Sequence, residues 1–206
     1  SANFDAEELD LIRATLRHAL ETSSPAAAPA ALLAAGWSDL VGTDPATALT
    51  ELAAAAGRAR SAAPVADLAI LWAAGIEAVG TTAVIAGRLV LAGADRASQF
   101  LVVGDAGVGI VDAAGVSLTP AGGFDPALGL SRATVDGPST PTGDAGTASA
   151  VMAAGRRAIA SQLTAAAGQM LGDTLVYVTA RHQYGRSIGS FQSVKHRLAD
   201  VAVAVA

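Results

Sequence analysis

Apolar residues recur at helical spacing through the first third of the chain. In residues 5–21 they stand on one face, opposite Asp, Glu and Arg, and the acidic residues gather in the first turn, where the helix dipole favours them. This apolar face consists of Leu9, Ile12, Leu16 and Leu20. The pattern predicts an amphipathic helix that ends at the prolines and serines of residues 22–29. Shorter helices rich in alanine and leucine are expected at residues 30–35, 46–56 and 65–77.

From residue 79 the pattern changes to short runs of β-branched and apolar residues. Glycine, aspartate and proline separate these runs at short intervals, which predicts an antiparallel sheet with tight turns. The runs are residues 81–86, 89–91, 99–103, 107–111, 116–119 and 131–135. The glycine-rich segment Gly104–Gly109 lies between two of them. It is interpreted as a hairpin turn, because it fits neither a dinucleotide fingerprint nor a phosphate-binding loop.

Two long helices are expected after a hinge rich in proline, glycine and threonine at residues 138–146. Residues 147–180 contain no proline and keep apolar residues at helical spacing, which predicts one long helix. A turn at residues 185–190 then leads to residues 191–206, whose closing Val-Ala alternation also allows a strand. A helix is favoured there, because its apolar stripe begins ten residues earlier, at Phe191.

The expected fold is therefore α+β and mainly helical. It has N-terminal helices at residues 1–77, a small antiparallel β part at 78–145, and long C-terminal helices at 146–206. The last helix shows neither a glycine cap nor a polar tail, so the C-terminal bundle is expected to be incomplete.

Composition narrows the class of protein. The chain has 206 residues and a net charge of −5, which argues against a nucleic-acid-binding domain. It has no cysteine, and its three histidines lack metal-ligand spacing, so neither a disulfide scaffold nor a metal site is predicted. The apolar run Leu68–Ile76 is too short to cross a membrane. Residues 1–20 do not form a signal peptide, so the cytoplasm is the expected location.

The apolar content comes largely from a small side chain. Hydrophobic residues make up 52% of the chain and aromatic residues only 4%, whereas alanine alone makes up roughly a quarter, well above ordinary usage. Alanine buries little area per residue, so the helices must approach closely to form a core. A helix pair with one apolar stripe also leaves surface for a partner, which predicts an oligomer.

The run Gly185-Arg186-Ser187-Ile188-Gly189 satisfies the nucleophile-elbow pattern G-x-S-x-G. Such an elbow joins a strand to a helix and is followed by the acid and then the histidine. Here a helix precedes the serine, and His196 comes before Asp200. The run is therefore interpreted as a turn between helices.

The densest run of polar, aromatic and basic residues is Arg181–Asp200. Its arginine suits a phosphate, its amides suit the polar edges of a ring system, and its tyrosine can lie against a flat ring. A well-capped helix hairpin would use the same residues. Chemistry alone favours neither interpretation.

This run strongly resembles the signature of the acyl-CoA dehydrogenase family, which lies at the junction of two long C-terminal helices. The matching residues are Arg181, Gln183, Tyr184, Gly185, Ile188, Phe191, Gln192, His196, Leu198, Ala199 and Asp200. The family layout of a helical lobe, a small β lobe and a helical bundle agrees with the expected fold. A weaker likeness runs upstream through the β part, and it is faint in the N-terminal helices.

The resemblance implies two ligand sites. Arg181 would contact the pyrophosphate of FAD held by a neighbouring subunit, and Gln183, Tyr184 and Gln192 would help line that shared flavin site. Arg156 corresponds to a family arginine beside the acyl-CoA thioester. Within one continuous helix, 25 residues separate the two arginines by about 37 Å, so one compact ligand cannot touch both.

The departures from the family concern the flavin ring and the catalytic base. The acidic-Pro-Gly-x-Gly-Ser-Asp and Trp-Ile-Thr/Ser segments that hold the ring are not recognisable between residues 79 and 136. One subset of the family places its catalytic glutamate where this chain has Gly155, and the commoner location lies beyond Ala206. No catalytic residue is therefore named.

The leading hypothesis is a subunit of an FAD-dependent acyl-CoA dehydrogenase, acting in fatty acid or sterol side-chain metabolism. It would assemble with itself or with another subunit of the family and catalyse α,β-dehydrogenation of an acyl-CoA. The alternatives are a non-catalytic partner that completes the flavin site of a relative, and a plain helical interaction module.

Overall fold

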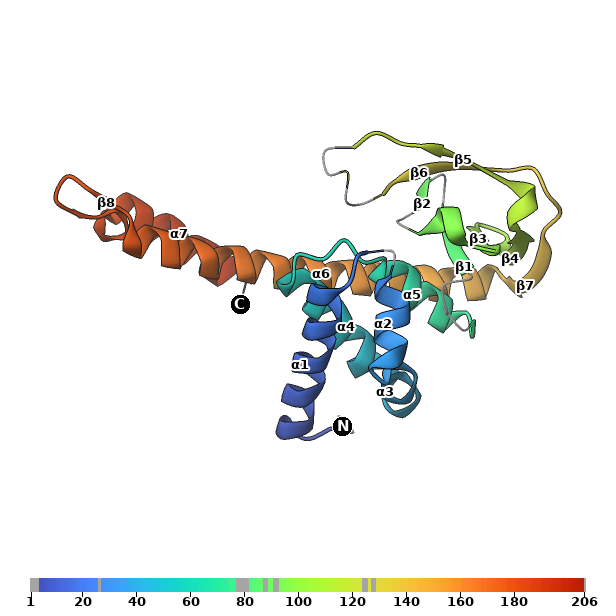
Figure 1. Cartoon of the computed structure of the whole chain (residues 1–206), viewed down its shortest axis with the longest axis horizontal. Helices are drawn as coiled ribbons and strands as arrows, with labels where there is room; N and C mark the ends of the chain where they lie inside the picture. The colour runs from blue at the N-terminus through green and yellow to red at the C-terminus, as the bar shows by residue number, and fades with distance from the viewer. Residues whose placement is uncertain are drawn as a thin grey trace.

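The computed structural model describes residues 4–25, 27–76, 82–86, 89–90, 93–123, 126 and 129–205. A group of N-terminal helices and a twisted sheet lie side by side along the first part of one very long helix (Figure 1). The rest of that helix leaves the body of the molecule, and the chain then turns and returns alongside it as a second helix, which makes a helical hairpin. Some of the boundaries expected from the sequence lie outside the described residues. These are the element ends at Glu77, Thr81, Leu91 and Ala206, and the boundary between the helical and β parts at 77–78.

The N-terminal helices are α1 (Ala6–Thr22), α2 (Ala28–Ala34), α3 (Trp37–Thr43), α4 (Pro45–Arg58) and α5 (Val65–Ala73). Four of them confirm the expected helices. The exception is α3, which no pattern predicted, because it is one short segment that contains glycine and begins after Gly36 in the left-handed region (φ 84°). Asp5 forms a capping box with Glu8 at the start of α1, which fixes where that helix begins.

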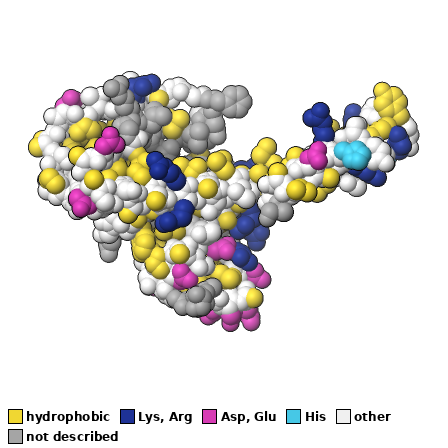
Figure 2. All heavy atoms as spheres, turned by 180° about the vertical axis from the view of Figure 1, so that it is seen from behind, with side chains coloured by type: hydrophobic (Ala, Val, Ile, Leu, Met, Phe, Trp, Pro, Cys, Tyr) yellow, Lys and Arg dark blue, Asp and Glu magenta, His cyan; other side chains and the backbone are white. Residues whose placement is uncertain are grey.

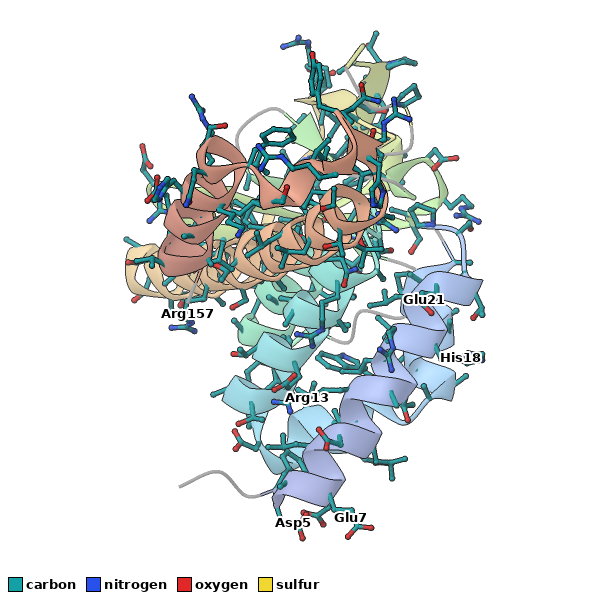
Figure 3. All side chains as sticks on the ribbon, turned by 90° about the vertical axis from the view of Figure 1, so that its left-hand side faces the viewer. Asp5, Glu7, Arg13, His18, Glu21 and Arg157 are labelled. Carbon is teal, nitrogen blue, oxygen red and sulfur yellow. The ribbon has the colours of Figure 1, made fainter. Side chains whose placement is uncertain are left out.

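Helix α1 packs on α4 through an apolar core and one ion pair at its rim. Leu16 and Leu52 are fully buried in this core. At the rim, Arg13, which is labelled in Figure 3, holds both carboxylate oxygens of Glu51, at 2.7 and 2.9 Å. The bidentate geometry fixes the register of the two helices.

The sheet has seven strands in the order β5-β6-β2-β1-β3-β4-β7. In chain order they are β1 (Thr82–Ala86), β2 (Leu89–Val90), β3 (Gln99–Gly104), β4 (Gly107–Asp112), β5 (Val116–Pro120), β6 (Ser131–Val135) and β7 (Thr140–Asp144). The hairpin expected at Gly104–Gly109 is confirmed, because β3 and β4 pair from Gln99 and Asp112 to Gly104 and Gly107.

Two features of the sheet differ from the sequence prediction. Strands β1 and β3 are parallel, whereas the other five pairings are antiparallel. After β2 the chain returns past η1 (Ala94–Arg96) to the start of β1, so β3 must run in the same direction. The expected hinge at 138–146 contains the edge strand β7, where Pro141 is tolerated because one side of an edge strand needs no hydrogen bonds.

Helix α6 (Ala145–Ala180) runs without interruption for 36 residues, as the sequence predicted. Asp144 caps it by accepting hydrogen bonds from the backbone N–H and the hydroxyl of Thr147, which lower the pKa of Asp144. The first half of α6 is packed against α4, α5 and the sheet, with Val151 and Ala158 buried. Because many residues in this half of α6 are small, α4, α5 and the sheet can all pack closely against it.

Beyond residue 163, α6 gradually leaves the body and runs beside α7 (Gln192–Val205), and we call residues 163–205 the arm (Figure 1). The base of the arm still contacts the body, since Gly57 lies against Ala166 and Arg60 forms an ion pair with Asp173. The two helices are joined by the strands β8 (His182–Gln183) and β9 (Arg186–Ser187) and by the 3-10 turn η4 (Ile188–Ser190). Apolar side chains remain exposed along the arm (Figure 2). They include Leu163, Met170, Leu175, Val176, Tyr177, Val201 and Val203. Among the described residues, no helix is long and apolar enough to cross a membrane.

Candidate functional sites

Arg156 lines a cavity of about 430 Å³ between the start of α6 and one end of the sheet. Ala145, Ser149 and Met152 join it from the same face of α6, and the β3–β4 turn contributes Asp105 opposite. The remaining lining residues are Ala86, Val103, Gly104 and Ala148. The spacing of these positions on α6 follows the helical repeat from Arg156, so sequence periodicity alone could have found them.

The charge of Arg156 is available to a ligand. Its side chain is exposed, and it forms no salt bridge with any carboxylate in the described part of the chain. The neighbouring Arg157 lines a different hollow, with Leu49 and Thr50 of α4, and points away from the sheet (Figure 3). The cavity therefore offers one exposed guanidinium, together with the hydroxyl of Ser149 and the carboxylate of Asp105.

Gly155, where one subset of the family has its catalytic glutamate, is buried under α5. A Cβ built on Gly155 would lie 2.7 Å from Cδ1 of Ile70, and Ile70 is itself buried. A larger side chain at this position would require Ile70 to move. The contact explains why glycine occupies position 155. Among the described lining residues of the Arg156 cavity, Asp105 is the one that carries a carboxylate.

The four residues expected at a flavin site lie together at the end of the arm, which we call the tip (residues 181–192). Arg181 ends α6, Gln183 pairs with Arg186 across the β8–β9 hairpin, and Gln192 begins α7. All four side chains are exposed, and that of Tyr184 is 93% exposed. Tyr184 also takes a positive φ of 53°, a strained backbone conformation for a tyrosine.

Contacts within the tip make it a defined structure. The guanidinium of Arg186 lies 4.1 Å from the centre of the Phe191 ring, and Tyr184 meets the same ring edge-on at 6.4 Å. The backbone N–H of Ile188 donates to the carbonyl of Arg181 at 2.8 Å. Arg186 is thus held by an aromatic ring inside the tip, whereas no described carboxylate pairs with Arg181.

Ser187, the middle residue of the G-x-S-x-G run, has a structural role here. Its hydroxyl donates to the carbonyl of Val178 in the last turn of α6, at 3.1 Å. The backbone of Gly189 approaches the same residue closely, since an added Cβ would lie 3.1 Å from the carbonyl oxygen of Val178. The expected turn between helices is therefore what the structure contains.

The structure keeps the two predicted groups of site residues apart. Because α6 is continuous from Arg156 to the tip, the two arginines are separated by about 37 Å along the helix. The Arg156 cavity adjoins the sheet of this chain, whereas the tip extends away from that sheet (Figure 1). One ligand bound to this chain's own cavity cannot reach Arg181.

Asp67 of α5 is not among the residues that the sequence pattern singled out. This residue lines a cavity of about 310 Å³ that reaches from α2 and α5 to β1 and η1. Burial raises the pKa of Asp67 to about 7, although a hydrogen bond from the backbone N–H of Val84 partly opposes this. A single aspartate in an apolar helix gives no sequence signal, because its burial depends on how α5 meets the sheet.

Comparisons with known proteins agree with the C-terminal signature. Residues 145–206 match the model of the acyl-CoA dehydrogenase C-terminal domain. Over 119 residues the chain is 35% identical to the acyl-CoA dehydrogenase IpdE2 of Mycolicibacterium smegmatis, a match that covers 52% of this chain and 36% of that relative. A shorter match to IpdE2 of Mycobacterium tuberculosis is 46% identical over 48 residues and covers 15% of that protein. The matches thus span well under two thirds of these curated relatives.

Solved structures extend the likeness to the whole fold. A steroid acyl-CoA dehydrogenase, Tcur3481-Tcur3483, superposes with a TM-score of 0.76 and 20% identity, covering 97% of this chain and 74% of that one. The ChsE4-ChsE5 complex from Mycobacterium tuberculosis gives 0.75 and 19%, covering 100% and 76%. A long helix with a small sheet at its start and a helical hairpin at its end thus defines an acyl-CoA dehydrogenase fold. The C-terminal part of the chain, residues 145–206, thus belongs to the acyl-CoA dehydrogenase family, and the chain as a whole has the fold of these enzymes.

Proposed function

We propose that the chain is a subunit of an FAD-dependent acyl-CoA dehydrogenase that introduces an α,β double bond into an acyl-CoA thioester. Arg156 would hold the thioester end of the substrate in the cavity beside the sheet. FAD, when bound, supplies the hydride acceptor, and the protein supplies orientation and hydrogen bonds. The base that takes the α-proton is not assigned to any residue of this chain.

The observation that carries this proposal is the exposure of the tip. An unpaired guanidinium, two amides and a nearly free tyrosine ring project from the end of the arm, away from the chain's own sheet. Guanidinium groups suit the pyrophosphate of FAD, and amides suit the polar edge of its ring system. The donor set at Arg181, Gln183, Tyr184 and Gln192 therefore fits a flavin that is held by a second subunit.

Assembly with another subunit follows from the same geometry. The exposed apolar side chains of the arm leave surface that a partner would cover. We propose a homo- or hetero-oligomer in which each tip completes the flavin site of its neighbour. The relative in the ChsE4-ChsE5 structure is likewise a complex of two different proteins.

The test uses the complex isolated from its own cells. The assembled complex is expected to contain FAD whose visible absorbance bleaches when octanoyl-CoA or another acyl-CoA is added. The isolated chain is expected to bind FAD weakly or not at all, since its β part lacks the ring-holding segments. A complex without flavin would contradict the proposal, and stoichiometric FAD on the isolated chain would contradict the sharing of the site.

One observation favours a second candidate function, that of a non-catalytic partner subunit. Gly155 is packed against Ile70, so one family position of the catalytic glutamate is closed in this chain. In that case the tip would serve a relative's flavin while the Arg156 cavity takes no part in turnover. The two candidates differ in one measurement, because Arg156→Gln would leave turnover of the complex unchanged only if this chain is non-catalytic.

A further inference from the structure

A further hollow, remote from the proposed acyl-CoA site, lies between α2, α3 and α5 and has a volume of about 390 Å³. Its described lining side chains are aliphatic or indole groups apart from that of Ser38, and none of them is charged. The lining residues are Pro29, Leu32, Leu33, Trp37, Ser38, Val41, Gly42, Leu68, Trp72, Gly75 and Ile76. We call it the tryptophan pocket.

The tryptophan pocket is deep and reaches the core of the helical lobe. Leu32, Val41 and Leu68 are at most 4% exposed and belong to the largest buried cluster. A docking patch on a flat surface would be walled by exposed side chains. Its volume and apolar walls are those of small-molecule sites, which range from about 300 to 1,000 Å³.

Both tryptophans of the chain line this one pocket, in a protein with only 4% aromatic residues. Trp37 is buried, whereas Trp72 is 38% exposed although most residues of its helix are buried. Two indoles offer large flat apolar faces, which suit a rigid ring system.

The pocket is separate from the Arg156 cavity, because the two have no lining residue in common. Helix α5 lines the tryptophan pocket but not the Arg156 cavity. Leu68 and Trp72 face the tryptophan pocket, whereas Ile70 lies against Gly155 of α6. A ligand in the tryptophan pocket would therefore leave the proposed substrate site open.

We propose that the tryptophan pocket binds an uncharged apolar small molecule that has a rigid ring system and one hydrogen-bonding group for Ser38. A charged ligand is disfavoured, because the described lining offers no counter-charge for a desolvated ion. A peptide segment is disfavoured as well, since its backbone N–H and C=O groups would find a single polar side chain there.

The test uses the tryptophans as reporters, because both lie in the pocket. Progesterone, a rigid uncharged four-ring ketone, is the probe, and decanoate, a charged flexible chain, is the comparison. Progesterone is expected to change the tryptophan emission of the purified chain saturably. Decanoate is expected to bind at least about tenfold more weakly, which corresponds to about 1.4 kcal/mol.

A matched pair of glycine substitutions tests where the probe binds. Gly42 lines the pocket and Gly172 lies on the arm, and a Cβ added to either meets nothing within 4 Å. Gly42→Leu is expected to fill the pocket and weaken progesterone binding at least about tenfold, whereas Gly172→Leu leaves it within about twofold. Thermal unfolding of both variants checks that they fold.

Three results would overturn the proposal. The first is the absence of a saturable change with progesterone, and the second is equal binding by wild type and a folded Gly42→Leu variant. The third is a tryptophan emission of the wild type that changes with protein concentration when no progesterone is present, while the emission of Gly42→Leu does not change. That result would mean that a second copy of the chain occupies the pocket.

Discussion

Gly57 of α4 lies directly against the backbone of α6 at Gln162. A Cβ on Gly57 would overlap the carbonyl oxygen of Gln162 and would lie 2.9 Å from the backbone nitrogen of Ala166. Because both neighbours are backbone atoms, neither can turn aside as a side chain can. The contact sets how closely the N-terminal helices approach the helix that carries both proposed sites.

Gly57→Ala is therefore expected to destabilise the chain, although alanine is the better helix former. Overpacking of this kind costs about 1–3 kcal/mol in the free energy of unfolding. The control is Gly172→Ala, which adds its methyl group in open space and should stabilise the chain by roughly 0.5–1 kcal/mol. Urea unfolding of the purified proteins measures both changes. Equal effects of the two substitutions would show that the helices can move apart at no cost.

Asp67 is expected to make stability depend on pH. Burial raises its folded-state pKa to about 7 from an ordinary 3.8. Between these values the folded chain holds a proton that the unfolded chain has lost, so the free energy of unfolding falls as the pH rises through this window. Above pH 7 the loss is complete.

The variant Asp67→Asn cannot ionise and keeps an oxygen for the N–H of Val84. We expect it to be more stable than the wild type at pH 8, with most of this advantage gone at pH 4. Urea unfolding at the two pH values checks this expectation, with Asp39→Asn on the exposed side of α3 as the control. If the advantage of Asp67→Asn is the same at both pH values, Asp67 is ionised throughout.

Arg156 and Arg157 are adjacent in sequence but line different hollows. Arg156→Gln is expected to weaken binding of octanoyl-CoA to the complex about tenfold to a hundredfold, because a hydrogen bond to a charged group is worth about 1.5–3 kcal/mol. Arg157→Gln should leave the affinity within about twofold. Isothermal titration calorimetry measures both. Similar losses in the two variants would point to general charge attraction rather than to a contact in the cavity.

Arg181 is expected to matter most for FAD among the arginines near the tip. Arg181→Ala should lower the affinity of the assembled complex for FAD about tenfold to a hundredfold, and Arg181→Lys should recover little, because lysine lacks the planar fork. Arg197→Ala, on the exposed side of α7, is the control. Equilibrium dialysis with FAD gives the affinities. Equal FAD affinity in the Arg181 and Arg197 variants would mean that the signature serves here only as a helix hairpin.

The sequence by itself determined the local structure of most of the chain. The heptad-like spacing of Leu9, Ile12, Leu16 and Leu20 predicted α1, and a run free of proline predicted the uninterrupted α6. The signature around Arg181 identified the family, because its residues are neighbours in sequence as well as in space. Such features depend on contacts within a few residues, which a sequence displays directly.

Only the tertiary structure decided what distant segments form together. The parallel pairing of β1 with β3 depends on where the chain returns after β2, and the raised pKa of Asp67 depends on how α5 meets β1. The tryptophan pocket joins Trp37 and Trp72 from α3 and α5, and the Arg156 cavity joins α6 to the β3–β4 turn. Each requires the packing of elements far apart in sequence, and the free energy of that packing belongs to the whole fold rather than to any local pattern.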